Sequence, residues 1–284
     1  MDSETPFDRR LRRQRRDQAA NKFARADYLH HLIANELMER LSLVTRTFRK
    51  AFILGAPDQY LEASLQQKGV EVTAADPGAK FGTAAGIQCD EDRLPIADEA
   101  FDLVLSIGLL DSVNDLPGAL ALIRRALKPD GLFLAAFAGA GSLPRLKSAM
   151  LAADAFEGGA APRIHPQIDI RTAGDLLTRA GFALPVVDSD AIIIRFPNLQ
   201  TLVADLRSMG ATNTLSARSR LPVRRFGLSA AKADFASAAD QDGKTAETFE
   251  IIYMIGWAPS PDQPLPARRG SGAQSLASIL GPKI

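Results

Sequence analysis

The sequence predicts an α/β fold built around a mostly parallel β-sheet. From Ala51 onward short apolar runs alternate with helical segments, which is typical of parallel strands joined by helices that cover both faces of the sheet. The runs are AFILG (51–55), VEVTAAD (70–76), FDLVLSI (101–107) and GLFLAAF (131–137). The stretch KPDG at 128–131 supports this fold class, because lysine, proline and glycine in this order indicate the end of a helix, with Gly131 turning the chain.

The segments around these runs have helical character. Residues 61–68 and 116–127 connect successive runs, and a further helix is expected at 172–180, ended by Gly181. Ahead of the first run, Ile33, Leu37, Leu41 and Val44 recur at spacings of four, four and three. This spacing places them on one face, so it predicts an amphipathic helix.

The second half of the chain predicts two more strands with an insertion between them. The apolar stretches 183–196 and 248–259 read as strands, and residues of about 198–242 are expected to form a helical insertion. The Gly- and Ala-rich segment after Phe137, with FEGGAAPRIHP at 156–166, reads as a loop. We divide the chain into a basic helical arm (1–48), a sheet domain (49–260) and a C-terminal tail (261–284) poor in core-forming residues.

The overall composition is that of a soluble globular protein, with 46% hydrophobic and 24% charged residues. A formal net charge of +1 argues against a dedicated nucleic-acid binder. The single cysteine, Cys89, has no partner for an internal disulfide, which favours a reducing compartment. No run approaches the ~18 apolar residues of a transmembrane segment, and the N-terminus lacks the apolar core of a signal peptide. We therefore expect a cytoplasmic location.

Positive charge is concentrated near the N-terminus. Between Phe7 and Arg25 seven arginines and one lysine face only two aspartates, a local charge of +6. Such a run is most often a solvated helix face. Its functional interpretation is docking to an acidic protein partner or to an anionic membrane surface, through the arm from Arg9 to Arg16.

Asp76 is the first candidate ligand-binding residue. Open parallel sheets bind ligands beyond the carboxyl ends of their strands, and Asp76 ends the second run, 21 residues after Gly55. A carboxylate at this position can accept hydrogen bonds from both ribose hydroxyls of a nucleoside. The alternative is that Asp76, Pro77 and Gly78 merely form a turn, and the residue types alone favour neither interpretation.

The stretch CDEDRLPIADEAFDLVLS (89–106) carries a more specific signal. This stretch has an acid followed by Leu-Pro, a turn and FDLVLS, an order that resembles the region from the third to the fourth strand of class I methyltransferases. The stretch ALALIRRALKPDGLFLAAF resembles the helix, turn and strand that come next in that family. The resemblance implies a Rossmann-like, mostly parallel seven-stranded sheet and the cofactor S-adenosylmethionine. In that family the first acid of the string accepts a hydrogen bond from the adenine amino group, which implies this role for Asp90.

Further motifs narrow the resemblance to one branch of the superfamily. FDRRLRRQRRDQAA, RTAGDLLTRAGFALPVVDSD, DLRSMGATN and TFEIIYMIGWAP look like the branch of mitochondrial complex I assembly factor 5 and its alphaproteobacterial relatives. Its best-known member hydroxylates an arginine of a complex I subunit, and related biotin-pathway enzymes methylate a carboxylate on an acyl carrier. The resemblance implies cofactor contacts from the following residues: Gly55, Ala56, Asp76, Pro77, Asp90, Glu91, Ser106 and Tyr28.

The first strand and its loop depart from the family pattern. Active members have an acid in this strand and a glycine-rich turn, whereas this chain has Ile53 in place of the acid and Pro57 and Gln59 in place of two glycines. Proline fixes φ and removes an amide donor. One lost charge-assisted hydrogen bond costs on the order of 1.5–3 kcal/mol, so these changes predict weak S-adenosylmethionine binding. Asp111 and Ser112 likewise replace a His-Trp pair that relatives often have.

Other chemistry-bearing residues give weaker signals. Ser106 and Ser142 have no histidine nearby in the sequence, so no nucleophilic triad is indicated. Adjacent His30 and His31 point in different directions on a helix, and we expect no metal site. His165 is expected mainly as an exposed loop residue, although it could face a pocket. Two functions stay open: a cofactor-dependent enzyme modifying a protein side chain or a small carboxylate, and a catalytically silent assembly factor.

Overall fold

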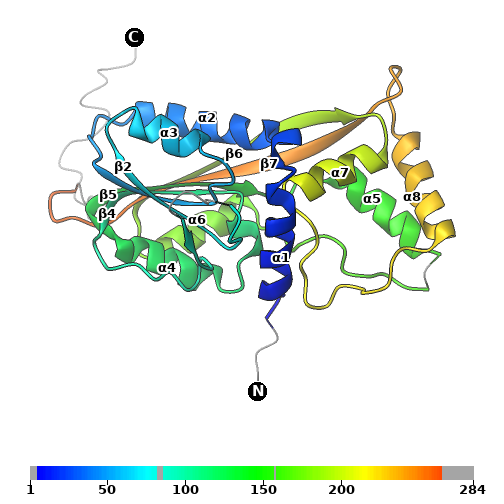
Figure 1. Ribbon diagram of the computed structural model, residues 1–284, viewed down its shortest axis with the longest axis horizontal. Coiled ribbons are helices and arrows are strands. Elements are labelled where there is room, and N and C mark those ends of the chain that lie inside the picture. Colours follow the sequence, from blue (N-terminus) through cyan, green and yellow to red (C-terminus); the bar gives the residue numbers. More distant parts are fainter. Residues whose placement is uncertain (1–4, 82–85, 157, 264–284) are drawn as a thin grey trace, which may run out of the picture.

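The computed structural model of the chain describes residues 5–81, 86–156 and 158–263. Its centre is a seven-stranded sheet with the order β3-β2-β1-β4-β5-β7-β6, in which β7 runs antiparallel to both of its neighbours (Figure 1). The strands are β1 (Lys50–Leu54), β2 (Glu71–Asp76), β3 (Ile87–Gln88), β4 (Phe101–Ile107), β5 (Leu127–Ala138), β6 (Ala183–Phe196) and β7 (Thr245–Trp257). The mostly parallel seven-stranded fold is therefore confirmed.

Helices cover both faces of this sheet. They are α1 (Arg9–Ala20), α2 (Tyr28–Ser42), α3 (Tyr60–Gln66), α4 (Leu116–Ala126), α5 (Pro144–Asp154), α6 (Ile170–Arg179), α7 (Leu199–Ser208) and α8 (Arg225–Ser237). In Figure 1, α2 and α3 lie above the sheet and α4 and α6 below it. The predicted apolar face of α2 is confirmed, because Ile33, Leu37 and Leu41 are buried in the main hydrophobic cluster.

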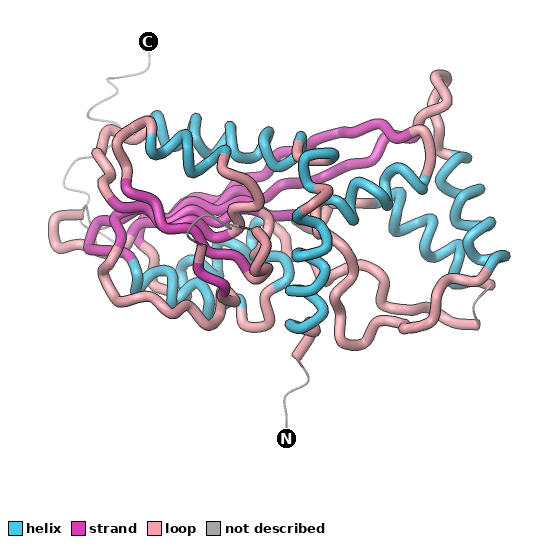
Figure 2. The backbone as a smooth tube through the Cα atoms, viewed as in Figure 1, coloured by secondary structure: helices cyan, strands magenta, loops and turns pink. Residues whose placement is uncertain are grey.

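The predicted helical insertion is present between the last two strands. It contains α7 and α8, and Figure 2 shows the long strands β6 and β7 reaching from the sheet toward these helices. The segment after β5 corrects the sequence-based expectation of a loop, because residues 144–154 form α5. Leu146, Ala149 and Ala153 recur at helical spacing and are buried. α5 packs against α8, a contact between distant segments that alanine-rich sequence does not reveal.

The KPDG turn also differs in detail from the prediction. Asp130, not Gly131, adopts the left-handed conformation, with φ 62°. Gly131 meets a different constraint, since a Cβ there would lie 2.9 Å from the carbonyl oxygen of Lys128. Of the helices in residues 5–81, 86–156 and 158–263, none is long and apolar enough to cross a membrane.

Gly55 has a structural role at the end of β1. Its φ is +86°, and a Cβ at this position would lie 2.3 Å from the carbonyl oxygen of Ile107, which follows from the pairing of β1 with β4. The glycine is therefore needed to let two strand ends approach, whether or not a ligand binds beside it.

We expect Gly55→Ala to lower the free energy of unfolding by about 2–4 kcal/mol, because it adds a steric overlap to the strain of positive φ. Gly69→Ala is the matched control, since Gly69 has φ +79° but open space around its Cβ position. That control should cost only about 1–2 kcal/mol. Urea denaturation measures both, and equal losses would show that the overlap with Ile107 is relieved without cost.

Candidate functional site

Four acidic side chains lie at the edge of the sheet where the parallel strands end. Asp76 is the last residue of β2, and Asp90, Glu91 and Asp92 follow β3, which pairs with the end of β2. Asp76, Asp90 and Glu91 are each at most 1% exposed. The structure thus brings the two predicted nucleoside-binding acids to one place. Buried carboxylates are costly unless cations or hydrogen bonds compensate them, so this row needs partners.

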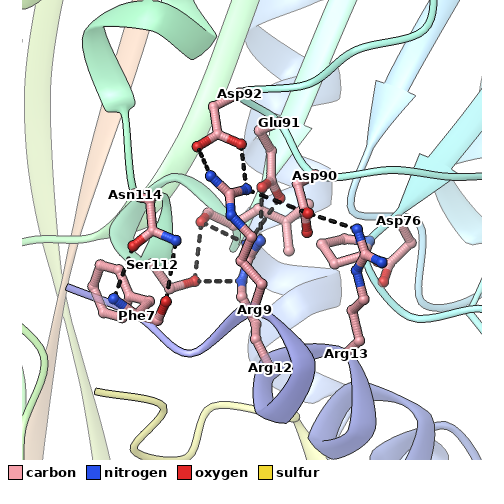
Figure 3. A network of polar contacts seen from close by, with 12 residues as sticks. Phe7, Arg9, Arg12, Arg13, Asp76, Asp90, Glu91, Asp92, Ser112 and Asn114 are labelled. Atoms are coloured by element: carbon pink, nitrogen blue, oxygen red, sulfur yellow. Dashed lines mark hydrogen bonds and ion pairs between the residues drawn. The ribbon is translucent and has the colours of Figure 1, made fainter. Parts of the chain in front are cut away.

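Helix α1 supplies these partners. Arg16 donates to both oxygens of Asp76 at 2.7 and 2.6 Å, and Arg12 to both oxygens of Glu91 at 2.7 and 2.8 Å. Two further pairs join Arg13 to Asp90 at 2.6 Å and Arg9 to both oxygens of Asp92 at 2.5 Å (Figure 3). We call these four pairs the arm–acid network.

The network follows from local sequence. Arginines at 9, 12, 13 and 16 have the spacing i, i+3, i+4 and i+7, which places all four on one helix face. Asp8 caps this helix by accepting a hydrogen bond from the amide of Leu11. The solvated cationic face that the sequence favoured is therefore wrong for Arg12 and Arg16, which are 5% and 8% exposed. Burial lowers the pKa of Arg12, but Glu91 raises it more, so Arg12 stays charged.

The arm also lies directly on the turn after β2. A Cβ on Gly78 would meet the Cβ of Arg16 at 2.9 Å, and Asp17 accepts a hydrogen bond from the amide of Lys80. The guanidinium of Arg16 lies 4.8 Å from the ring centre of Phe81. Pro77 is part of this turn, where its carbonyl accepts from the side chain of Gln88 at 3.0 Å. The arm thus occupies the position beside Asp76 that a bound ribose would need.

The residues present do not fit an adenosine while α1 is in place. Asp76 Oδ1 accepts from both Arg16 and the Gly78 amide, and Oδ2 accepts from Arg16, so both oxygens are engaged. Asp90 Oδ2 is held by Arg13, while Asp90 Oδ1 is buried with no hydrogen-bond partner in the described segments. The hydroxyl of Ser106 is likewise buried and without a partner there. Glu91 is bound to Arg12 and is not available to a ligand.

The end of β1 and the start of the loop that follows it pack as part of the core. Ile53 is fully buried in the main cluster, and Ala56 is 2% exposed in the same cluster. The Gly55 amide donates a hydrogen bond at 2.9 Å to the carbonyl of Ala75, which lies on the neighbouring strand β2. Asp58 lies 2.6 Å from His31, which ties the loop to α2. An isoleucine suits this apolar surrounding, at the position where active family members have an acid.

Comparisons with known proteins assign the chain to a family. Residues 54–135 match the family model described as a methyltransferase domain. The mitochondrial arginine-hydroxylase NDUFAF5 of Danio rerio is 35% identical over 285 residues, which cover 96% of this chain and 89% of that protein. The Homo sapiens protein of the same name is 34% identical, with 96% and 83% covered. The chain belongs to the NDUFAF5 family of methyltransferase-domain proteins.

More distant relatives agree with this assignment. A malonyl-[acyl-carrier protein] O-methyltransferase of Laribacter hongkongensis is 28% identical over 265 residues, covering 86% of this chain and 87% of that protein. Among solved structures, the YcgJ protein of Bacillus subtilis has a TM-score of 0.56 at 13% identity, with 80% of this chain and 99% of that chain covered. A methyltransferase-like structure from Bacillus halodurans has a TM-score of 0.53 at 14% identity, with the same coverage. At these low identities, the two structures show only that the chain has the class I methyltransferase fold.

Beside the arm–acid network, this NDUFAF5-family protein has a cavity of about 360 Å³. Its floor is the carboxyl end of β4 at Ile107 and Gly108, and its walls come from α1, α2, α5, α7 and β7. His165 lines it, with a side chain only 15% exposed, so the expectation of an exposed loop histidine is wrong. His165 Nε2 accepts from the amide of Thr214, and Nδ1 lies 3.7 Å from Asp111.

Ser112, the second residue of the replaced His-Trp pair, also serves the arm. Its hydroxyl accepts from Arg12 Nε at 3.1 Å. The N-terminal end of the arm is held on both sides, because the Asn114 side chain bonds the amide and carbonyl of Phe7, and the amide of Asp8 donates to Thr214 in the insertion. The arm is thus fixed to the sheet domain and to the insertion together.

The remaining predicted residues have other surroundings. Tyr28 opens α2 and donates to Asp205 of α7 at 2.9 Å, and burial together with Asp205 raises its pKa. Cys89 is buried, and burial and the neighbouring acids raise its pKa to about 12, which makes it unreactive. His30 is also inward-facing, and its pKa is lowered to about 4 mainly by burial. The described residues contain no group of three or more metal-ligating side chains.

Sequence reasoning found Asp76 and Asp90 but missed their partners. A partial signal was present in the i, i+3, i+4, i+7 spacing of Arg9, Arg12, Arg13 and Arg16, but Arg10 and Arg15 lie off that face, so the spacing alone does not distinguish a binding face from a helix charged all round. Docking of the arm to an acidic partner or an anionic membrane surface stays a prediction. Arg10 is exposed in the structure and is therefore accessible to such a partner.

We expect Arg16→Gln to lower the free energy of unfolding by about 3–5 kcal/mol, because it leaves the buried Asp76 carboxylate without its cation. Adding Asp76→Asn should recover part of that loss, since the uncompensated charge is then removed. Lys50→Gln is the control, because Lys50 and Glu71 form an exposed pair at 3.3 Å and its loss should cost less than ~1 kcal/mol. Chemical denaturation measures all three, and similar losses for Arg16→Gln and Lys50→Gln would refute a stabilising network.

Proposed function

We propose that this protein is a non-methylating member of the NDUFAF5 family that acts as a binding factor in the assembly of respiratory complex I. The observation that carries the proposal is the buried bidentate pair between Arg16 and Asp76. The carboxylate expected to hold the ribose of S-adenosylmethionine is bound by the protein's own helix.

The energetics favour the closed arrangement. Ribose hydroxyls would donate to Asp76 as neutral groups, whereas Arg16 supplies two hydrogen bonds together with the opposite full charge at a buried site. Displacing α1 would also separate Arg12 from Glu91 and would leave that carboxylate buried without its cation. Each 1.4 kcal/mol spent on displacement lowers the apparent affinity about tenfold. Ile53 in β1 and Pro57 in the loop that follows it offer little in compensation.

A second function has one observation in its favour. The unpartnered Asp90 Oδ1 and the engaged Asp76 lie at the same sheet edge, so displacement of α1 would open a site for S-adenosylmethionine. In that case the protein is a cofactor-dependent enzyme that modifies a protein side chain or a small carboxylate. The names of its relatives include both an arginine hydroxylase and a carboxylate methyltransferase.

Calorimetric titration with S-adenosylmethionine and S-adenosylhomocysteine separates the two functions. We expect no binding up to millimolar concentration for the unmodified protein, and none for an Arg13→Gln/Arg16→Gln variant that keeps its fold by circular dichroism. Arg10→Gln is the matched control on the exposed face of the same helix. Micromolar binding to the unmodified protein would overturn the proposal. Binding that appears only after Arg13 and Arg16 are replaced would identify an enzyme whose cofactor site is gated by the arm.

A further inference from the structure

The cavity beside the network combines an apolar interior with cationic groups. Leu29, Ile33, Leu146, Val203 and Phe249 contribute to its lining, and they come from α2, α5, α7 and β7. Its volume of about 360 Å³ lies within the range of small-molecule sites, roughly 300–1,000 Å³. Apolar walls with few polar groups are typical of sites that bind an amphipathic small molecule.

Three polar groups of this cavity lack hydrogen-bond partners. Arg15 Nε, His30 Nε2 and Thr212 Oγ1 are buried and make no hydrogen bond within the described residues, and all three residues line the cavity. Buried polar atoms are nearly always paired in folded proteins, so three orphans around one space indicate a missing ligand. An arginine and a hydroxyl both donate hydrogen bonds, which favours an acceptor as that ligand.

The charge around the cavity favours an anion. Arg16 and Arg163 also line it, but Asp76 and Asp154 compensate them at 2.6 and 2.5 Å. Arg15 and Arg207 also line the cavity and form no ion pair with a residue that the structure describes, and Arg207 is exposed. Burial and the nearby charges of Arg218 and Arg207 lower the pKa of Arg15. This repulsion between like charges is relieved when an anion binds between them.

The single acid in the lining does not cancel this charge. Asp111 lies next to His165, 3.7 Å away, and is close enough to Arg12 to raise the pKa of that arginine. The groups that Asp111 is shown to affect are thus His165 and Arg12, whereas Arg15 interacts electrostatically with Arg207, and Thr212 lines the same cavity.

We propose that this cavity binds a small amphipathic anion, with its carboxylate held by Arg15, Arg207 and Thr212 and its apolar chain packed against α2, α5 and α7. The site lies beside the acids of the arm–acid network and uses none of them. It therefore goes beyond the proposed function, which assigns no ligand to this cavity.

Octanoate is the probe ligand. Octanol is the control that has the same chain length without the charge, and acetate is the control that has the carboxylate without the long chain. We expect calorimetry to show octanoate binding that is at least about tenfold tighter than octanol binding, because charge-assisted hydrogen bonds hold the head group. Acetate should show no binding, and octanoate binding should weaken as salt is added. An Arg15→Gln/Arg207→Gln variant should bind octanoate at least about tenfold more weakly, whereas Arg10→Gln should bind it unchanged.

Several outcomes would overturn the proposal. One is equal binding of octanoate and octanol, and another is unchanged octanoate binding in the Arg15→Gln/Arg207→Gln variant with a native circular dichroism spectrum. The absence of octanoate binding at millimolar concentration would overturn the proposal as well. Displacement of octanoate by S-adenosylhomocysteine would assign the cations to the amino-acid end of the cofactor instead. That last result also tests the proposed function separately, since it requires the cofactor product to bind.

Discussion

The pairing of one helix face with one row of acids determines most of what is distinctive in this protein. Parallel strands end with Asp76 and the acids after β3 at one edge, and carboxylates buried there destabilise the fold unless cations meet them. Arg16 and Arg12 meet two of them with two hydrogen bonds each. The position of α1 follows from these bonds. The adjacent cavity follows as well, because Arg15 and Arg16 of the same helix form part of its lining.

The same pairing engages the acid to which the resemblance to methyltransferases assigns the cofactor's ribose. The sheet order and the antiparallel β7 are those of the class I methyltransferases, and the identity with NDUFAF5 extends over almost the whole chain. Function resides in sites rather than in the fold, so a retained sheet says little about turnover. Gly55 illustrates this point. Its retention looks like a remnant of a cofactor loop, yet the approach of the Ile107 carbonyl is sufficient to explain it.

The sequence was informative where structure is local and less so where it is not. The apolar runs predicted β1, β2, β4 and β5 because buried parallel strands are continuously hydrophobic, and the spacing in α2 predicted its buried face. α5 was missed because its alanines become part of the core through packing against α8 and β7, which lie about seventy or more residues later. Asp76 and Asp90 could be found from strand ends and a family motif. That Arg16 binds Asp76 could not, since the two residues are 60 positions apart and no local rule relates them.

The double attachment of the arm has a consequence for communication within the molecule. Asn114 after β4 bonds the backbone of Phe7, while Asp8 is bonded to Thr214 in the insertion, so the two residues that lead into α1 bridge two structural units. We therefore expect a displacement of the insertion to shift the helix that covers Asp76. A ligand that moved the insertion would then change how accessible the strand ends are, and a ligand at the strand ends would change the affinity at the insertion by the same factor.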